Sequence, residues 1–148
     1  MPLLKYKKSE ALKELEKEFH AQKKLSHPTV PEYALLTTKF SDDSANSLTA
    51  SIMAFLKLKN CFGARVNTQG NYSQRLGKFI TSGSTKGMPD ISAIVKGRFV
   101  GIEVKFSKDV QSDRQKVIQQ QIEEAGGLYY IARDFESFQA WYNENFNN

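Results

Sequence analysis

The sequence has few of the residues that build disulfides or metal sites. Its 148 residues include one cysteine, Cys61, and two histidines, His20 and His27. A single cysteine excludes an internal disulfide and a cysteine-rich zinc site. Neither histidine lies near a recognisable motif, and the sequence shows no histidine spacing typical of a metal site, so we assign neither a role.

Long apolar runs are also missing. No segment approaches the roughly 18 consecutive apolar residues that a membrane-spanning helix needs. The lysines near the N-terminus are not followed by an apolar stretch, so we expect no signal peptide. Together with the single cysteine, these absences predict a soluble, cytoplasmic protein without a membrane partner.

Acidic residues are outnumbered by basic ones. The chain has 16 aspartates and glutamates against 21 lysines and arginines, which gives a net charge of +5 and a pI of about 9.3. This moderate basicity favours a polyanionic partner such as nucleic acid, although many basic proteins bind none. The length is sufficient for one domain with a real core.

Apolar spacing, capping residues and turn residues predict the order of the elements. We expect residues 1–43 to form a helix and an irregular linker ahead of the main domain, residues 44–148. The predicted helices are residues 9–24, 44–60, 112–125 and 134–146, and the predicted strands are residues 61–67, 77–81, the hairpin within 87–105, and 128–132. This order predicts a mixed α/β domain with helices packed on a central sheet.

The segment GMPDISAIVKGRFVGIEVK, residues 87–105, places two acids and a lysine in an otherwise apolar hairpin. If Lys96-Gly97 forms the turn, Asp90 lies opposite Glu103. Directly opposed residues share a face of a sheet, and Lys105, two positions after Glu103, shares it as well. The sequence therefore predicts that three charged side chains converge on one face.

Two opposed carboxylates repel each other and raise one pKa unless a positive charge separates them. Lys105 gives partial relief, and a divalent cation such as Mg²⁺ or Mn²⁺ gives more, because carboxylates are hard oxygen ligands. We expect Gly101 to leave open space on this face. The alternative is an ordinary exposed strand face with a surface salt bridge between Glu103 and Lys105, which would mean little.

The full pattern is more specific than the charges alone. Gly87, Pro89-Asp90 and Glu103-Val104-Lys105 are followed by a helix start, Ser112-Asp113-Arg114-Gln115. This combination resembles the PD-(D/E)XK nuclease superfamily, and within it the VRR-NUC and Holliday-junction-resolvase branch of small phage or bacterial proteins. The resemblance covers roughly residues 45–142, because the segment 45–70 is also similar to the first helix and strand of such members.

The resemblance implies a restriction-endonuclease-like α/β core with a central mixed sheet flanked by helices, here with an N-terminal helical extension. It also implies a metal-dependent DNA endonuclease, bacterial or phage-encoded, that acts on branched or structured DNA and pairs into a homodimer. Asp90, Glu103 and the backbone carbonyl of Val104 would be the metal ligands, Lys105 would be the catalytic lysine, and Gln115 would approach from the helix. An alternative for Gln115 is a capping box with Ser112.

Five further residues are candidate contacts to nucleic acid. They are basic or polar residues and one glycine that could contact phosphate or sugar: Arg65, Asn67, Lys78, Lys86 and Gly87. A glycine-containing backbone can approach a phosphate closely, and a nearby lysine can neutralise it. As isolated positions, the alternative for each is a solvated surface residue.

One departure from the family pattern bears on activity. The family usually has a glutamate on the first core helix, whereas residues 46–51 contain no acid. Asn46 could supply a neutral oxygen, or Asp42 or Asp43 could reach in from upstream. A missing ligand leaves open a second hypothesis, a catalytically inactive DNA-binding module that keeps the fold. A third is a generic α/β protein that binds a partner through its N-terminal helix.

Overall fold

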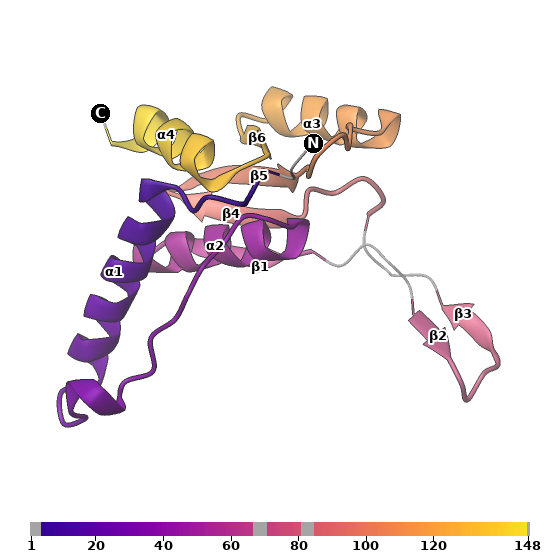
Figure 1. The fold of residues 1–148 in the computed structure, drawn as a ribbon. Helices are drawn as coiled ribbons and strands as arrows, with labels where there is room; N and C mark the ends of the chain where they lie inside the picture. The colour runs from indigo at the N-terminus through magenta and orange to yellow at the C-terminus, as the bar shows by residue number, and fades with distance from the viewer. Residues whose placement is uncertain (1–3, 67–70, 81–84, 148) are drawn as a thin grey trace.

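The computed structural model describes residues 4–66, 71–80 and 85–147 and confirms the predicted α/β class (Figure 1). The elements in chain order are α1 (Glu10–Ser26), the short 3-10 helix η1 (Glu32–Ala34), α2 (Ala45–Leu58), β1 (Phe62–Arg65), β2 (Asn71–Ser73), β3 (Lys78–Ile80), β4 (Ile91–Val95), β5 (Arg98–Val104), α3 (Asp113–Glu124), β6 (Leu128–Ala132) and α4 (Phe135–Phe146). Among the described residues, no helix is both long and apolar enough to cross a membrane.

The central sheet has four strands in the order β1-β4-β5-β6. Strands β1, β4 and β5 run antiparallel, and β6 runs parallel to β5, so the sheet is mixed. The turn between β4 and β5 is Lys96-Gly97, and both residues have positive φ, 49° and 79°. Such a two-residue turn fixes the hairpin register. The predicted pairing of Ile91 with Ile102 and Val95 with Arg98 is confirmed.

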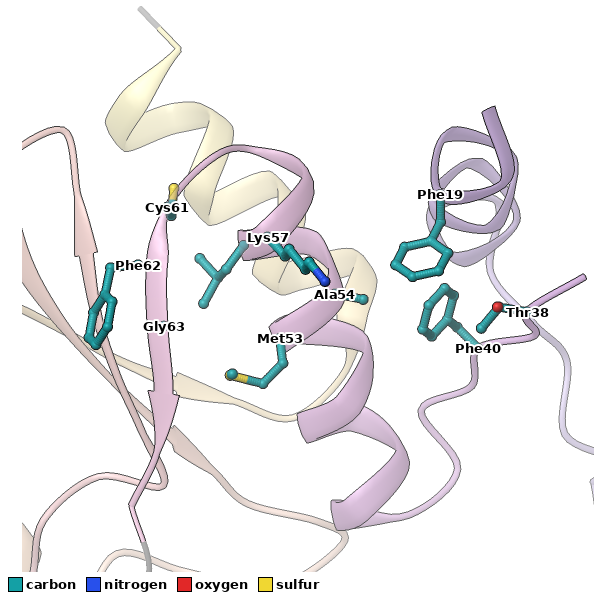
Figure 2. Close-up of a pocket in the computed structure, with 10 residues that line it drawn as sticks. Phe19, Thr38, Phe40, Met53, Ala54, Lys57, Cys61, Phe62 and Gly63 are labelled. Atoms are coloured by element: carbon teal, nitrogen blue, oxygen red, sulfur yellow. The ribbon is translucent and has the colours of Figure 1, made fainter. Parts of the chain in front are cut away.

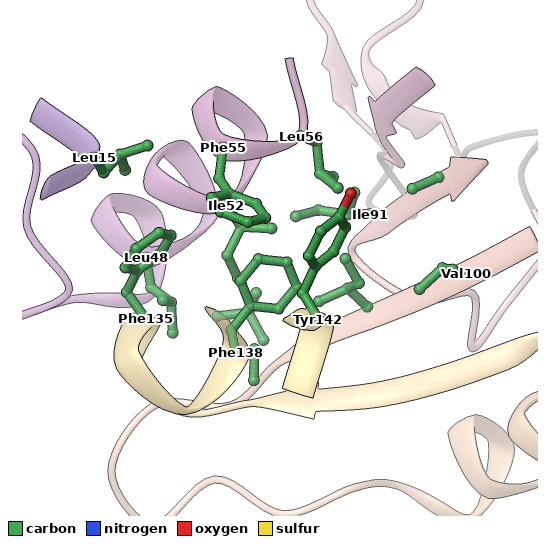
Figure 3. Close-up of a cluster of buried hydrophobic side chains, with 14 of the residues drawn as sticks. Leu15, Leu48, Ile52, Phe55, Leu56, Ile91, Val100, Phe135, Phe138 and Tyr142 are labelled. Carbon is green, nitrogen blue, oxygen red and sulfur yellow. The ribbon is translucent and has the colours of Figure 1, made fainter. Parts of the chain in front are cut away.

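One face of the sheet packs against α2 and α4. Alternate residues of β4 are buried, as a strand with one apolar face requires. Figure 3 shows side chains of α2 and α4, among them Phe55 and Phe138, meeting the strand residues Ile91 and Val100. The rings of Phe55 and Phe138 lie edge to face, with centroids 5.5 Å apart. This cluster is the main core.

Helix α1 belongs to the same core. Its buried side chains Leu12 and Leu15 join the cluster formed by α2, α4 and the sheet, and α1 packs against both helices. Ser9 caps its first turn by accepting the N–H of Leu12. The domain boundary after residue 43 stays a prediction, but α1 packs on the main body.

The opposite face of the sheet packs against α3, which leaves little space beside Gly101. A Cβ atom at Gly101 would lie 2.8 Å from Cγ of Pro89 and 3.3 Å from Cδ1 of Ile122. Tyr129 of β6 comes almost as close. The expectation of open space at Gly101 is therefore wrong, because Pro89 and α3 already fill the volume that a side chain would need.

A second, two-stranded sheet is formed by β2 and β3. Figure 1 shows this hairpin, in pink, set apart from the four-stranded sheet. We predicted one short strand here, near residues 77–81, and the structure places β3 within that range. The partner strand β2 was not predicted, since its three residues, Asn71–Ser73, carry no apolar alternation.

Candidate active site

Asp90 lies where β4 begins, and the backbone holds it on both sides. Its carbonyl oxygen accepts the N–H of Val66, which follows β1, at 2.8 Å. Its carboxylate oxygen Oδ2 accepts the N–H of Val104, at the end of β5, at 2.8 Å. A hydrogen bond from a backbone N–H to a carboxylate is charge-assisted and directional. Asp90 is therefore pinned to the end of β5, next to Glu103.

Glu103 is the buried member of the pair. It is only 2% exposed, although glutamate is almost never fully buried without a partner. Its oxygen Oε1 accepts a hydrogen bond from Nε2 of Gln115 at 2.6 Å and lies 3.2 Å from Nζ of Lys105. Its other oxygen, Oε2, is buried and has no hydrogen-bond partner within the described residues. An unpaired buried oxygen is costly and calls for an explanation.

The surroundings of Glu103 disfavour its charge. Burial is the main cause that raises its pKa above the ordinary value, and the negative charge of Asp90 raises it further. Hydrogen bonds from Lys105 and Gln115 act in the other direction without cancelling the effect. The charge of Asp90 thus acts in the same direction as burial, as expected for two acids on one face of the hairpin.

Lys105 is held in place from the main chain. Its N–H donates to the carbonyl oxygen of Ala132, on β6, at 2.9 Å. Its side chain is 13% exposed, so the ammonium lies at the border between Glu103 and solvent. A cation in this position can pair with Glu103 and still reach a phosphate that approaches from outside.

Gln115 performs both of the roles considered for it. Its oxygen Oε1 accepts the N–H of Ser112 at 2.9 Å, and Ser112 in turn accepts the N–H of Gln115, which completes a capping box on α3. Its amide nitrogen remains available and donates to Glu103. The capping geometry therefore orients the amide toward the carboxylate.

The donor set fits a hard divalent cation that keeps several of its waters. Asp90 and Glu103 supply carboxylate oxygens, and Oε2 of Glu103, which has no partner in the described part of the chain, is the buried atom that such an ion would satisfy. In the part of the chain that the structure describes, no group of three or more His, Cys, Asp and Glu side chains is arranged to hold a metal ion. A cation here would rely on two acids, backbone oxygen and water.

Asp42 and Asp43 are engaged elsewhere. Asp42 accepts the hydroxyl of Tyr6 at 2.7 Å and the N–H of Phe135 at 2.9 Å, which ties the N-terminal segment to the start of α4. Asp43 accepts hydroxyls of Ser41 and Ser47 at the start of α2. The hypothesis that an upstream acid completes the metal site is therefore not supported.

Two of the expected nucleic-acid contacts lie away from the acids. Arg65 pairs across the sheet with Ile91, which faces the main core, so Arg65 projects from the other face than Glu103. Its guanidinium donates to Oδ1 of Asn46 at 3.3 Å, which occupies that neutral oxygen. Lys78 lies on β3 of the separate hairpin, and Asn67 lies outside the described residues.

The other two, Lys86 and Gly87, lie against the start of α3. The carbonyl of Lys86 accepts a hydrogen bond from Nε of Arg114 at 3.2 Å, and the side chain of Lys86 is exposed. Gly87 has a φ of +84°, and a Cβ there would lie 2.7 Å from Cγ of Arg114. Only glycine fits both constraints, so Gly87 is needed to seat the loop that leads to Asp90.

Sequence reasoning missed two neighbours of the site. Arg114 contacts the loop before Asp90, and its place inside the Ser-x-x-Gln segment was the available signal. Tyr129 lies on β6, and burial raises the pKa of its phenol to about 12, with the charges of Glu103 and Asp90 adding to the effect. Its position within an apolar strand gave no signal of that proximity.

A pocket of about 470 Å³ lies elsewhere, among α1, α2 and β1. Figure 2 shows that Phe19, Phe40 and Met53 line it, with Cys61 at one end and the ammonium of Lys57 nearby. None of the described residues that line it is acidic. This pocket is an apolar hollow, and the charged groups described above are not part of it.

Comparison with known proteins adds no further constraint. No protein-family model, no curated protein and no solved structure matches this chain. The arrangement of the site itself must therefore carry the functional argument.

Proposed function

We propose that this chain is a metal-dependent DNA endonuclease with a core of the PD-(D/E)XK type. The observation that carries the proposal is the buried carboxylate of Glu103, which lies beside a second acid and a lysine and has one oxygen without a hydrogen-bond partner among the described residues. A purely structural glutamate would have little reason to stay in such a place. The order helix, three antiparallel strands, helix and parallel strand around this site also agrees with the fold that the sequence resemblance implies.

In this proposal Asp90, Glu103 and the carbonyl of Val104 hold a Mg²⁺ or Mn²⁺ ion. When bound, such an ion lowers the pKa of water and polarises a phosphoryl oxygen. The hydrogen bond from Val104 keeps Asp90 oriented, and the amide of Gln115 keeps Glu103 oriented. Both ligands are thus positioned before any ion or DNA arrives, which lowers the cost of assembling the site.

Lys105 supplies the positive charge for the reacting phosphate. Phosphodiester hydrolysis places additional negative charge on the phosphoryl oxygens in the transition state, and a fixed ammonium stabilises that charge. The side chain is 13% exposed and therefore accessible from solvent. Losing such a contact typically costs a factor of about 10² to 10³ in rate.

The substrate in this proposal is DNA with a branched or otherwise structured form, cut by a homodimer in the cytoplasm of a bacterium or a phage-infected cell. The net charge of +5 supports a polyanionic substrate. The preference for branched DNA and the dimer rest on the sequence resemblance alone.

A second candidate is a DNA-binding module that has the same fold and no nuclease activity. The observation in its favour is that the described residues contain no third acidic metal ligand. Its weakness is that Asp90 and Glu103 are kept side by side, which destabilises a site that no longer binds metal.

The test compares cutting with binding. Purified protein is incubated with supercoiled plasmid and with four-way-junction DNA in Mg²⁺, in Mn²⁺ and in chelator. We expect metal-dependent cutting by the wild type and a loss of at least about 100-fold in Asp90→Asn and Lys105→Ala. Lys116→Ala, which changes a lysine whose side chain is 63% exposed on α3, is the control and should cut normally. DNA binding without cutting under every metal condition would instead support the module.

A further inference from the structure

The β2–β3 hairpin presents two aromatic side chains that are largely exposed. Tyr72 and Phe79 are directly opposed in the antiparallel pairing, so their side chains share one face of the hairpin. The exposed fraction is 63% for Tyr72 and 62% for Phe79. Leu76, in the connecting turn, is exposed as well. Apolar groups that gather on a surface in this way mark interaction sites more often than single exposed side chains do.

An isolated two-stranded hairpin is only marginally stable in water, and it normally needs an apolar face packed against something. Figure 1 shows β2 and β3 set apart from the four-stranded sheet and its helices. A partner that covers Tyr72 and Phe79 would therefore stabilise the hairpin by burying their apolar surface.

Charge indicates the class of that partner. Between Asp43 and Asp90 the sequence contains six lysines or arginines and no acidic residue, although acids make up 16 of the 148 residues. Two of these cations, Arg75 and Lys78, lie in the hairpin, and both are exposed. The charged side chains of the hairpin are therefore both positive, which complements a phosphate backbone, whereas protein surfaces usually present both signs.

The chain itself keeps the hairpin near the candidate active site. Ile80, at the end of β3, precedes Asp90 by ten residues. An extended chain spans at most about 3.6 Å per residue, so the end of β3 lies within about 36 Å of Asp90. That limit is on the order of ten base pairs of duplex DNA, which rise about 3.4 Å each. A DNA bound at Asp90 that extends for more than about ten base pairs is therefore long enough to reach the hairpin.

We propose that the hairpin is a nucleic-acid-binding arm on which Tyr72 and Phe79 stack against unpaired bases, while Arg75 and Lys78 contact the phosphates beside them. Aromatic side chains bind bases of any identity, because every base has a π-face. Fully paired DNA does not offer its base faces, so the arm favours branched, flapped or single-stranded DNA. This proposal deepens the nuclease proposal and rests on it for the position of the cut.

The test measures binding without cutting. Dissociation constants are determined by fluorescence anisotropy in chelator for three DNAs of equal length: single-stranded, four-way junction and fully paired duplex. The double variant Tyr72→Ala/Phe79→Ala should bind the first two about 10-fold or more weakly and the duplex about as well as the wild type. Tyr33→Ala, which removes an exposed tyrosine of η1, is the matched control. Circular dichroism checks that each variant is folded.

The outcomes separate the arm from the nuclease. Loss of single-strand and junction binding in a protein that cuts no DNA would support the arm and reject the nuclease. If the wild type cuts DNA and the double variant binds all three DNAs normally, the arm is rejected and the nuclease is not. The same holds if the double variant loses equal affinity for all three DNAs. The arm is also rejected if the wild type binds none of the DNAs, or if light scattering shows that the double variant binds DNA normally and only loses self-association.

Discussion

The side-chain amide of Gln115 links the start of α3 to the carboxylate of Glu103. Its oxygen accepts the N–H of Ser112 in the capping box, and its nitrogen donates a 2.6 Å hydrogen bond to Glu103. The start of α3 and the orientation of the buried carboxylate are therefore coupled. Helix capping and positioning of the candidate active site depend on one side chain, and they can be separated by choosing which partner to remove.

The first prediction uses that separation. Ser112→Ala removes the hydroxyl that accepts the backbone N–H of residue 115 but keeps both hydrogen bonds of the Gln115 side chain. Gln115→Ala keeps that hydroxyl and removes the side-chain hydrogen bonds to the N–H of Ser112 and to Glu103. Each variant loses one half of the capping box, and we expect each to lose about 1 kcal/mol in free energy of unfolding, the usual cost of a lost capping interaction. Only Gln115→Ala should also lose cleavage, by about 10-fold or more, because Glu103 is no longer oriented. Urea unfolding and plasmid cleavage measure the two effects, and equal cleavage by both variants would contradict the positioning role.

A second prediction concerns the packed volume at Gly101. A methyl group there meets Pro89 at 2.8 Å and Ile122 at 3.3 Å, and overpacking of this kind costs typically about 1–3 kcal/mol. Because Pro89 adjoins Asp90, Gly101→Ala should also reduce cleavage. Gly63→Ala is the control, since its nearest neighbour is a methyl group at the end of the Leu56 side chain, at 3.2 Å, rather than a proline ring at 2.8 Å. Thermal unfolding that ranks the control as the less stable protein would be inconsistent with this packing.

A third prediction concerns pH. Burial, and then the charge of Asp90, raise the pKa of Glu103 above its ordinary value of 4.5. The folded protein then keeps a proton that the unfolded chain has released. The free energy of unfolding of the metal-free protein should therefore fall as pH rises from about 4.5 through the folded pKa, and level off above it.

Glu103→Gln has no such proton to lose. In chelator its stability relative to the wild type should increase over the same pH interval and then become constant. Urea unfolding at a series of pH values, from about 4.5 to about 8, measures the difference between the two proteins. A difference that does not change with pH would show that Glu103 titrates normally.

Local signals were sufficient for much of the fold. The turn at Lys96-Gly97 fixed the register of the β4–β5 hairpin, since glycine accepts the positive φ that this turn requires. Ser9 and Ser112, at helix N-termini, placed the starts of α1 and α3 to within a residue. These features depend on neighbours in sequence, which is why the sequence alone could predict them.

Features that depend on distant segments were not predictable in this way. The space beside Gly101 is filled by α3, which follows later in the chain, and nothing near Gly101 announces that contact. Asp42 binds the N–H of Phe135, 93 residues away, instead of approaching the candidate metal site. Glu103, which is 2% exposed, likewise lies between segments that follow later in the chain: it pairs with Ile131 of β6 and accepts a hydrogen bond from Gln115 of α3. The sequence predicted that the three charged side chains converge, but it did not predict that Glu103 is buried.

A direct measurement of metal binding tests whether Asp90 and Glu103 together hold a cation. Isothermal titration of Mn²⁺ into the DNA-free wild type should show saturable binding with release of protons from Glu103, measured as a dependence of the heat on the buffer. Asp90→Asn and Glu103→Gln should each abolish that binding, while Lys116→Ala keeps it. Binding of equal strength in all four proteins, or no binding in the wild type, would contradict the claim that Asp90 and Glu103 together hold a cation.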